Sequence, residues 1–228
     1  MALSFIKSLP FFNDLPEEDL LEVAQNSRSA DFSAGHVLLK AGETPGYLMI
    51  VLAGTVQLNE LAEDGRVIGI AYAGPHDLLA WLSIVDSKPI SQTIVAATNC
   101  KLLVCPIALI QTLLAKNALL ANRLLTLSAN SIRHLEQARA MLSLPNAFHR
   151  VFVQISLLSA SANAGVTNLP KQQDIANSVN TSRETVSRAL QMLIKSGVLR
   201  KVGHQIVIKQ AETLKKLAID GPEAMPVE

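Results

Sequence analysis

The chain has 228 residues, of which 49% are hydrophobic, and its formal net charge at pH 7 is +1. This length suits one or two domains and this composition supplies real hydrophobic cores, so an intrinsically disordered chain is excluded. No uninterrupted apolar run reaches the ~18 residues of a membrane span, and the N-terminus lacks a signal peptide's long apolar centre, so we expect a cytoplasmic protein with no membrane partner. The two cysteines, Cys100 and Cys105, and the five scattered histidines suggest neither a disulfide framework nor a metal site, and we expect no cofactor.

Two short helices are predicted near the N-terminus, over residues 3–9 and 16–25, the second opened by Asp14 as its N-cap. From residue 30 to residue 106 the pattern changes to short runs rich in Val, Ile and Leu that glycines separate. Strands of this length at intervals of about 8 to 12 residues predict a compact antiparallel barrel or roll. Within it, an Asp-Gly pair has the chemistry of a tight turn and predicts a hairpin at residues 63–66.

A short helix to about residue 114 should open at Pro106, and Asn117 should cap a longer helix over residues 118–143. The longer helix would span ~39 Å and carries more apolar surface than one face can bury within a small domain. Two stripes run along it at helical spacing. The first contains Leu125, Ser128, Ile132, Leu135, Arg139 and Leu142, of which Ser128 and Arg139 make an apolar seam imperfect. The second contains Leu120, Leu124, Leu127 and Met141. We therefore expect a partner for this helix; a bundle within the chain is the alternative, but no later amphipathic helix of matching length would complete it.

Pro145 should stop the long helix, because the residue before a proline is pushed out of helical geometry, so residues 143–146 are a predicted hinge. Beyond the hinge, residues 148–158 have an apolar helical face. Residues 159–167 have the composition of a flexible surface loop, and the tail after Ala218 is expected to be frayed.

The stretch from residue 167 to 208 has the helix-start and turn signals of a helix-turn-helix. Pro170 suits the first position of a short helix, and Asn180 tolerates the left-handed backbone of a sharp turn. Thr181 and Glu184 then have the spacing of a capping box, which opens a second helix with one apolar stripe.

A small hairpin should follow this second helix. Gly197 ends the helix as its C′ residue, and residues 198–202 and 205–208 alternate as paired strands do, which predicts a winged helix-turn-helix. Charge is asymmetric, because residues 145–210 carry a net +6 and residues 1–144 a net −3. A basic end on a nearly neutral protein fits phosphate binding at that end.

The polar face of the second predicted helix is crowded near its N-terminus, the end that a recognition helix presents to base edges. Arg pairs two donors with guanine and Glu accepts from cytosine, so we expect Arg183, Glu184 and Arg188 to read a G·C-rich half-site. The candidates for contacts with the DNA backbone are Thr181, Ser182, Ser187, Lys171 and Lys201. An ordinary solvated helix face is the alternative.

The run from Ser182 to Arg188, Ser-Arg-Glu-Thr-Val-Ser-Arg, resembles the recognition-helix signature of the Crp/Fnr transcription regulators, whose docking is a standard example of helix-turn-helix binding. The resemblance covers roughly residues 10 to 210, and the glycine spacing in the strand region is similar to the β-roll of cyclic-nucleotide-binding domains. It implies a homodimer on a palindrome of double-stranded DNA with TGTGA-like half-sites, Arg183 and Arg188 on guanines, Glu184 on cytosine, and RNA polymerase as a further partner. The first stripe of the long helix would be the dimer seam and the second would pack on the chain's own roll.

We accordingly expect an α+β protein with three parts. These are a β-roll effector domain with flanking helices over residues 1–116, a dimerisation helix and hinge over residues 117–144, and a winged helix-turn-helix DNA-binding domain over residues 145–228.

The sequence departs from the resemblance at the effector cassette. Members that bind cAMP carry a Gly-Glu pair and, about ten residues on, an Arg with a small hydroxyl residue; here Ala80-Trp81 replaces the pair and no arginine lies between Asp86 and Thr98. A cyclic phosphate without a positive partner is costly to bury, so we predict that the chain does not bind cAMP or cGMP. The candidates for the pocket of an unknown small-molecule effector are His76, Leu79, Ala80, Trp81, Lys88 and Leu135. A cavity filled by Trp81 itself is the alternative.

The predicted function is a dimeric transcription regulator in which a ligand shifts the population of hinge states. A ligand-binding module that acts on proteins, with an incidental basic domain, is the alternative of another class, and DNA affinity that does not fall with salt would favour it. No nucleophile-base arrangement, paired carboxylates or P-loop indicates an enzyme.

Overall fold

The computed structural model describes residues 2–61, 67–160, 166–167, 169–202 and 205–224. The chain divides into two compact units, Met1–Ser131 and Ile132–Glu228, and the division falls within the long helix α5 (Ala118–Leu142). No helix in the described part of the chain is long and apolar enough to cross a bilayer. The same residues contain no group of three side chains that could hold a metal ion.

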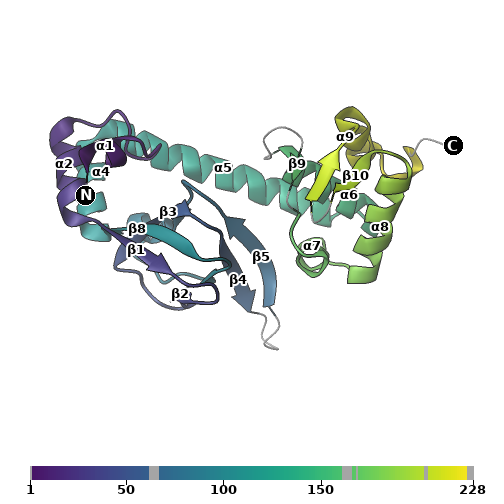
Figure 1. The fold of residues 1–228 in the computed structure, drawn as a ribbon, viewed down its shortest axis with the longest axis horizontal. Coiled ribbons are helices and arrows are strands. Elements are labelled where there is room, and N and C mark those ends of the chain that lie inside the picture. The colour runs from purple at the N-terminus through teal and green to yellow at the C-terminus, as the bar shows by residue number, and fades with distance from the viewer. Residues whose placement is uncertain (1, 62–66, 161–165, 168, 203–204, 225–228) are drawn as a thin grey trace. The chain divides into compact units, whose positions relative to one another are not determined.

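The first unit is an antiparallel roll of two four-stranded sheets (Figure 1). One sheet has the order β1 (Arg28–Phe32), β8 (Cys100–Pro106), β3 (Tyr47–Ala53), β6 (Leu78–Leu79). The other has the order β2 (Val37–Leu39), β7 (Thr93–Ala96), β4 (Val56–Leu61), β5 (Val67–Ala73). The prediction of an antiparallel roll is therefore confirmed. The predicted turn at residues 63–66 lies outside the described residues, although β4 and β5, which flank it, do pair antiparallel.

Two hydrophobic layers follow from the alternation of side chains along β3. Because successive strand residues point to opposite faces, Met49 and Val51 pack between the two sheets, whereas Leu48 and Ile50 pack against helices. The helices of this unit are α1 (Leu3–Lys7), α2 (Glu17–Asn26), α3 (Leu82–Asp86) and α4 (Ile107–Lys116). The pattern of strands buried on both faces explains why the strand region of the sequence is so rich in apolar residues.

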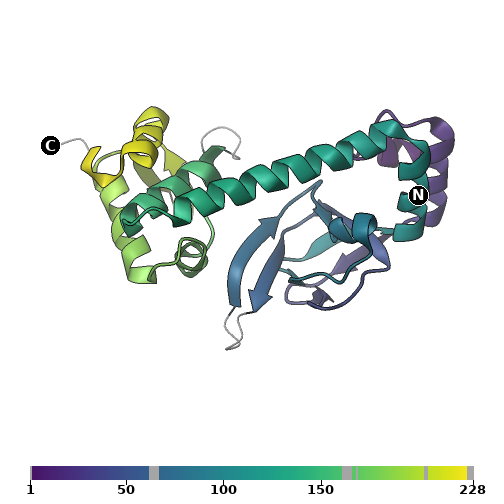
Figure 2. The same cartoon turned by 180° about the vertical axis from the view of Figure 1, so that it is seen from behind.

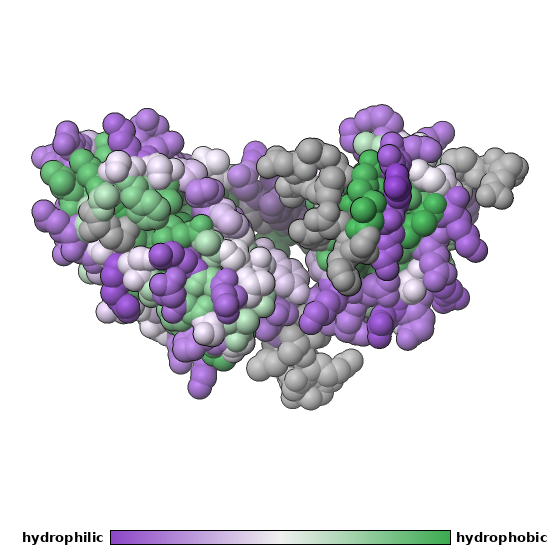
Figure 3. Space-filling view, in the orientation of Figure 1, coloured by the Kyte–Doolittle hydropathy of each residue, from purple (hydrophilic) through white to green (hydrophobic). Residues whose placement is uncertain are grey.

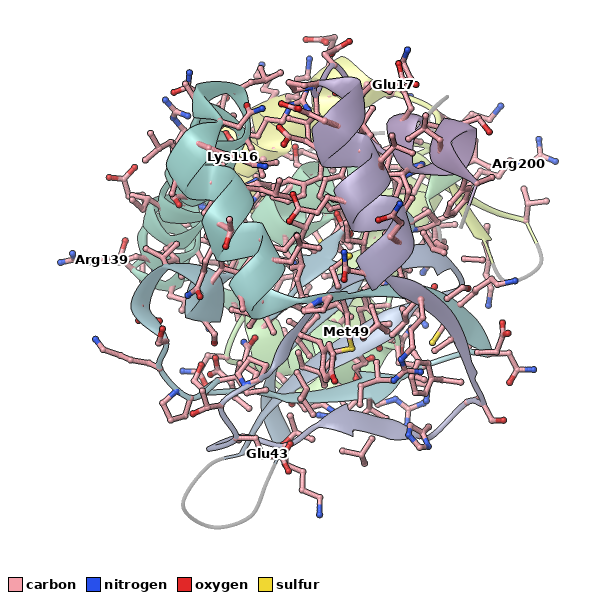
Figure 4. The ribbon with its side chains drawn as sticks, turned by 90° about the vertical axis from the view of Figure 1, so that its left-hand side faces the viewer. Glu17, Glu43, Met49, Lys116, Arg139 and Arg200 are labelled. Carbon is pink, nitrogen blue, oxygen red and sulfur yellow. The ribbon has the colours of Figure 1, made fainter. Side chains whose placement is uncertain are left out.

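The junction of α4 and α5 is fixed by polar contacts to α2, which lies beside α4 (Figure 2). Asn117 caps α5 as predicted, since its Oδ1 accepts from the backbone N–H groups of Leu119 at 3.1 Å and Leu120 at 3.3 Å. The preceding residue, Lys116, places its ammonium 2.8 Å from the buried carboxylate of Asp19 on α2 (Figure 4).

The predicted N-cap of α2 is wrong. Pro16 occupies the N-cap position and makes no side-chain cap bond, and Asp14 has φ 59°. The Asp14 carboxylate instead lies 3.2 Å from the guanidinium of Arg123 on α5. With a left-handed backbone two positions before the cap, Asp14 cannot direct its side chain to the first turn of the helix. The prediction from acidic residues near the helix start was wrong for this reason.

The two stripes of α5 differ in burial. Leu120 and Leu124 are buried and Leu127 packs against the helical layer of the roll, as expected of the second stripe. Met141 departs from that expectation, because it lies in the core of the second unit. In the first stripe, the large apolar side chains are exposed: Leu125 by 66%, Ile132 by 58%, Leu135 by 70% and Leu142 by 48%.

Beyond the end of α5, the described part of the second unit packs four α-helices and a small sheet. Its elements are α6 (Ala147–Ala160), β9 (Val166–Thr167), α7 (Gln172–Ser178), α8 (Arg183–Lys195), β10 (Leu199–Val202), β11 (Gln205–Ile208), α9 (Ala211–Asp220) and a 3-10 turn, η2 (Pro222–Ala224). The hairpin of β10 and β11 is confirmed as the wing, with its turn outside the described residues. The unit buries one contiguous core that includes Phe152, Val186 and Leu193.

Two expectations about this unit are wrong. Val166–Thr167 is a short strand that pairs with β11 and not part of a loop. A strand of two residues is too short to produce a recognisable sequence pattern. The chain beyond the wing also contains α9, which was not predicted, and the tail from residue 222 to 224 forms η2 with Ala224 packed against the core. Leu214 and Leu217 on α9 are buried at helical spacing, which is the signal that the sequence offered.

Candidate nucleic-acid interface

The turn between α7 and α8 sets the direction of α8. Asn180 takes the left-handed conformation that was predicted, with φ 50°. Ser182, and not Thr181, is the N-cap of α8, and its Oγ accepts from the backbone N–H of Thr185 at 3.1 Å. The reason is that the N–H of Thr181 still donates to Ala176 O at 2.9 Å and so closes the end of α7, which moves the cap one residue on.

The start of α7 is also displaced from its prediction. Lys171 is the N-cap and Gln172 the first helical residue, so Pro170 lies outside the helix. The end of α8 agrees with the sequence pattern, since Gly197 follows the C-cap residue Ser196 with φ 72°.

The buried face of α8 explains the exposure of its polar face. Val186, Ala189, Leu190 and Leu193 are buried, and this apolar stripe turns the opposite side of the helix to solvent. Arg183, Glu184 and Arg188 are exposed there. The surface over α7 and the N-terminal end of α8 is accordingly hydrophilic (Figure 3).

The three candidate base-reading side chains lie together. A shallow recess on the second unit is lined by Gln172, Arg183, Glu184, Ser187 and Arg188. The structure thus brings the two guanidinium groups, the carboxylate and the Ser187 hydroxyl into one place. Gln172 was missed by the sequence reasoning; its position in the first turn of α7 was the only signal available.

The other candidate backbone contacts do not line this recess. Lys171 is exposed at the start of α7, Ser182 is exposed at the cap of α8, and Thr181 is half-buried beside it. Lys201 is exposed on β10 of the wing, where the neighbouring Arg200 projects outward (Figure 4).

The carboxylate of Glu184 is held in its ionised form. Its own backbone N–H and the Ser182 hydroxyl donate hydrogen bonds to it, and Arg183 and Arg188 lie near enough to act on its charge. These contacts lower the pKa of Glu184 from its ordinary value. At neutral pH the side chain is therefore an acceptor only, which is the state that can accept from a base amino group.

The first unit contains a separate cavity of about 220 Å³ in the roll. Its lining is mostly apolar and includes Leu58, Leu78, Trp81, Ile90 and Ile94, together with Ala80 and Lys88. Trp81 lines the cavity without filling it. Ala80 has φ 61°, a left-handed backbone that is unusual for a residue other than glycine and that occurs at the turn from β6 into α3.

Three of the six candidate pocket residues do not line this cavity. Leu79 is 1% exposed within the layer between the sheets. His76 lines a different recess with Pro10, Phe11 and Arg123, and Leu135 lies exposed on α5.

Comparison with known proteins follows the same division of the chain. A family described as "Cyclic nucleotide-binding domain" matches residues 30–117, and one described as "Crp-like helix-turn-helix domain" matches residues 120–217, so that together they cover most of the chain. The chain is 25% identical to the "CRP-like cAMP-activated global transcriptional regulator" of Mycobacterium tuberculosis, over 91% of this chain and 95% of that protein. It is 27% identical to the "Cyclic AMP receptor protein" of Thermus thermophilus, over 93% and 98% respectively. Among solved structures, FixK2 from Bradyrhizobium japonicum matches with a TM-score of 0.74 and 25% identity, over 84% of this chain and 96% of that one.

Proposed function

The chain belongs to the Crp/Fnr family of DNA-binding transcription regulators, and from that membership we propose that it is a homodimer that reads palindromic sites with TGTGA-like half-sites. The observation that carries the proposal is the group formed by Arg183, Glu184 and Arg188 on the first turns of α8, exposed and lining one recess. These are the turns that a recognition helix presents to the major groove.

Each side chain has a chemical role in this proposal. Arg183 and Arg188 donate to the O6 and N7 atoms of guanines, and Glu184 accepts from the N4 amino group of a cytosine. Phosphates are contacted by hydroxyl and ammonium groups of the same unit, namely those of Thr181, Ser182, Ser187, Lys171 and Lys201. RNA polymerase is the further partner and the cytoplasm the compartment of such a regulator.

The dimer is formed along α5. Leu125, Ile132, Leu135 and Leu142 recur at the spacing of a two-helix seam and leave large apolar side chains in solvent in the single chain. Ser128, at the same spacing, is half-buried and its hydroxyl donates to Leu124 O at 2.9 Å, so its polar group needs no partner across the seam.

The cavity in the roll serves an effector other than cAMP. Among the residues that the structure describes, Lys88 is the only basic one in the lining of this cavity. The Lys88 side chain is 77% exposed, and its ammonium lies 3.8 Å from the Asp86 carboxylate. A cyclic phosphate bound there would face an apolar interior and, at the rim, an ammonium that is already paired. Neither would replace the water that the phosphate loses on binding, so burying it would be costly.

Two measurements test these statements. Selection of binding sites from a random duplex library with the full-length protein should enrich palindromes with TGTGA-like halves; an enriched sequence without two-fold symmetry would contradict the proposed dimer.

Trp81 is the only tryptophan in the sequence and lines the cavity, so its fluorescence reports on whether the cavity is occupied. Titration with cAMP to millimolar concentration should leave that fluorescence unchanged, and a saturable change would refute the exclusion of cAMP.

A further inference from the structure

The first turn of α6 touches the helix-turn-helix at two points that the base-reading proposal does not use. Asn146 caps α6, its Oδ1 accepting from the backbone N–H groups of Phe148 at 2.8 Å and His149 at 3.3 Å. With the turn fixed in this way, Phe148 and Arg150 point toward α8 and toward the turn before it.

Arg150 bridges, by hydrogen bonds, the segments that follow two helices. Its Nε donates to Val179 O at 2.8 Å and its Nη2 to Asn180 O at 3.0 Å, directly after α7. Its Nη1 donates to Leu144 O at 2.7 Å and to Pro145 O at 3.3 Å, in the segment that follows α5. Val179 is the C-cap of α7, and the last carbonyls of a helix lack partners within it and carry partial negative charge, so the guanidinium satisfies the end of α7 while it also holds the segment that follows α5.

The shape of the guanidinium matters for this contact. Its N–H groups are fixed in one plane and spread over two edges, which lets one side chain reach four carbonyls from two segments. A lysine ammonium keeps the charge but is a single point and cannot bridge both segments. The position of Asn180, whose left-handed backbone starts the turn into α8, is therefore tied through Arg150 to the end of α5.

Phe148 acts on a base-reading side chain directly. The guanidinium carbon of Arg188 lies 5.8 Å from the centroid of the Phe148 ring, within the range of a cation–π contact. Phe148 is itself partly buried against the core of the unit, so the ring is a fixed platform under a long and otherwise flexible side chain. Holding Arg188 before DNA arrives reduces the ordering that binding would otherwise require.

We propose that this first turn of α6 is a positioning element for base reading, in which Arg150 sets the turn before α8 and Phe148 orients Arg188. The inference rests on the proposed function, since it presupposes that Arg188 reads a base. Neither Phe148 nor Arg150 needs to contact DNA.

The test uses the full-length protein and the duplex that it selects from a random library, with fluorescence anisotropy as the readout. Phe148→Leu should raise Kd for the selected site by about two- to fivefold, the value of an exposed cation–π contact, and leave Kd for a scrambled duplex unchanged. In an Arg188→Ala background the same substitution should have no further effect, because contacting residues are not additive. A Phe148→Leu effect of equal size in both backgrounds would overturn the role of Phe148.

Arg150→Lys should weaken the selected site roughly tenfold, the loss expected for hydrogen bonds from a charged group. Hydrogen exchange in this variant should quicken at residues 179–185 and not throughout the unit; a uniform increase would show a merely structural role and would contradict the inference. His149→Ala is the matched control, since His149 lies in the same turn but its Nε2 is 2.9 Å from Ala218 O on α9. It should leave sequence discrimination unaltered.

The failures of the two proposals are distinguishable. If the wild-type chain selects no sequence, base reading itself is wrong and the positioning role falls with it. If it selects a sequence and both Phe148→Leu and Arg150→Lys retain wild-type discrimination, only the positioning role is wrong.

Discussion

Substitution of Leu135 by alanine tests the dimer seam on α5. Leu135 is 70% exposed in the single chain, and full burial of a leucine side chain contributes about 1.5–3 kcal/mol. Covering that exposed part in a dimer is therefore worth about 1–2 kcal/mol per copy, or about 2–4 kcal/mol for both copies of a symmetric interface. Alanine removes most of this, so the dissociation constant of the dimer should rise about 30- to 900-fold.

Sedimentation equilibrium over a range of protein concentrations measures this constant directly. Gln137→Ala is the control, because Gln137 is exposed on α5 but lies off the seam. Circular dichroism should show that both variants keep their helices. If Leu135→Ala associates as tightly as the wild type, or if the wild type is a monomer at all concentrations, the assignment of the seam is wrong.

Three further predictions concern charge and protonation. Lys201→Ala should weaken binding about equally to all duplexes and reduce the slope of log K against log salt by about 1, as loss of one phosphate contact does; an unchanged slope would remove Lys201 from the interface. Because the pKa of Glu184 is lowered, its carboxylate stays ionised at pH values within and below the ordinary glutamate range, so discrimination at the cytosine should stay constant from pH 8 to pH 6 and be lost only as pH falls through that lowered pKa; a loss near pH 6 would refute the ionised acceptor. Burial raises the pKa of Cys105 to about 11, so iodoacetamide at pH 8 should modify it only after unfolding, and rapid labelling of the native protein would contradict its burial.

The sequence predicted the architecture because each element carried its own local signal. Short apolar runs separated by glycines predicted the roll. Asn180 and Gly197 predicted the two changes of direction around α8, and each has the positive φ that its residue type favours. The spacing of Arg183, Glu184 and Arg188 predicted one exposed face, and the structure places them in one recess.

What the sequence did not reveal depends on contacts between distant segments. The N-cap of α8 is Ser182 and not the predicted Thr181, because the Thr181 N–H donates to Ala176 O at the end of α7. No local sequence pattern predicts that hydrogen bond. Asp14 pairs with Arg123, more than a hundred residues away, and so does not cap α2. The two contacts of α6 with the turn and with Arg188 likewise join residues about thirty to forty positions apart, where side-chain spacing carries no signal.

The measurement that tests base reading most directly is the affinity of the wild type and of Glu184→Ala for two duplexes. One duplex carries TGTGA-N6-TCACA, and in the other the G·C pair assigned to Glu184 is replaced in both halves. The wild type should prefer the first by about 1–3 kcal/mol for each altered half-site, and Glu184→Ala should lose that preference while still discriminating at the other positions. Equal affinity of the wild type for both duplexes, or unaltered discrimination by Glu184→Ala, would contradict the account.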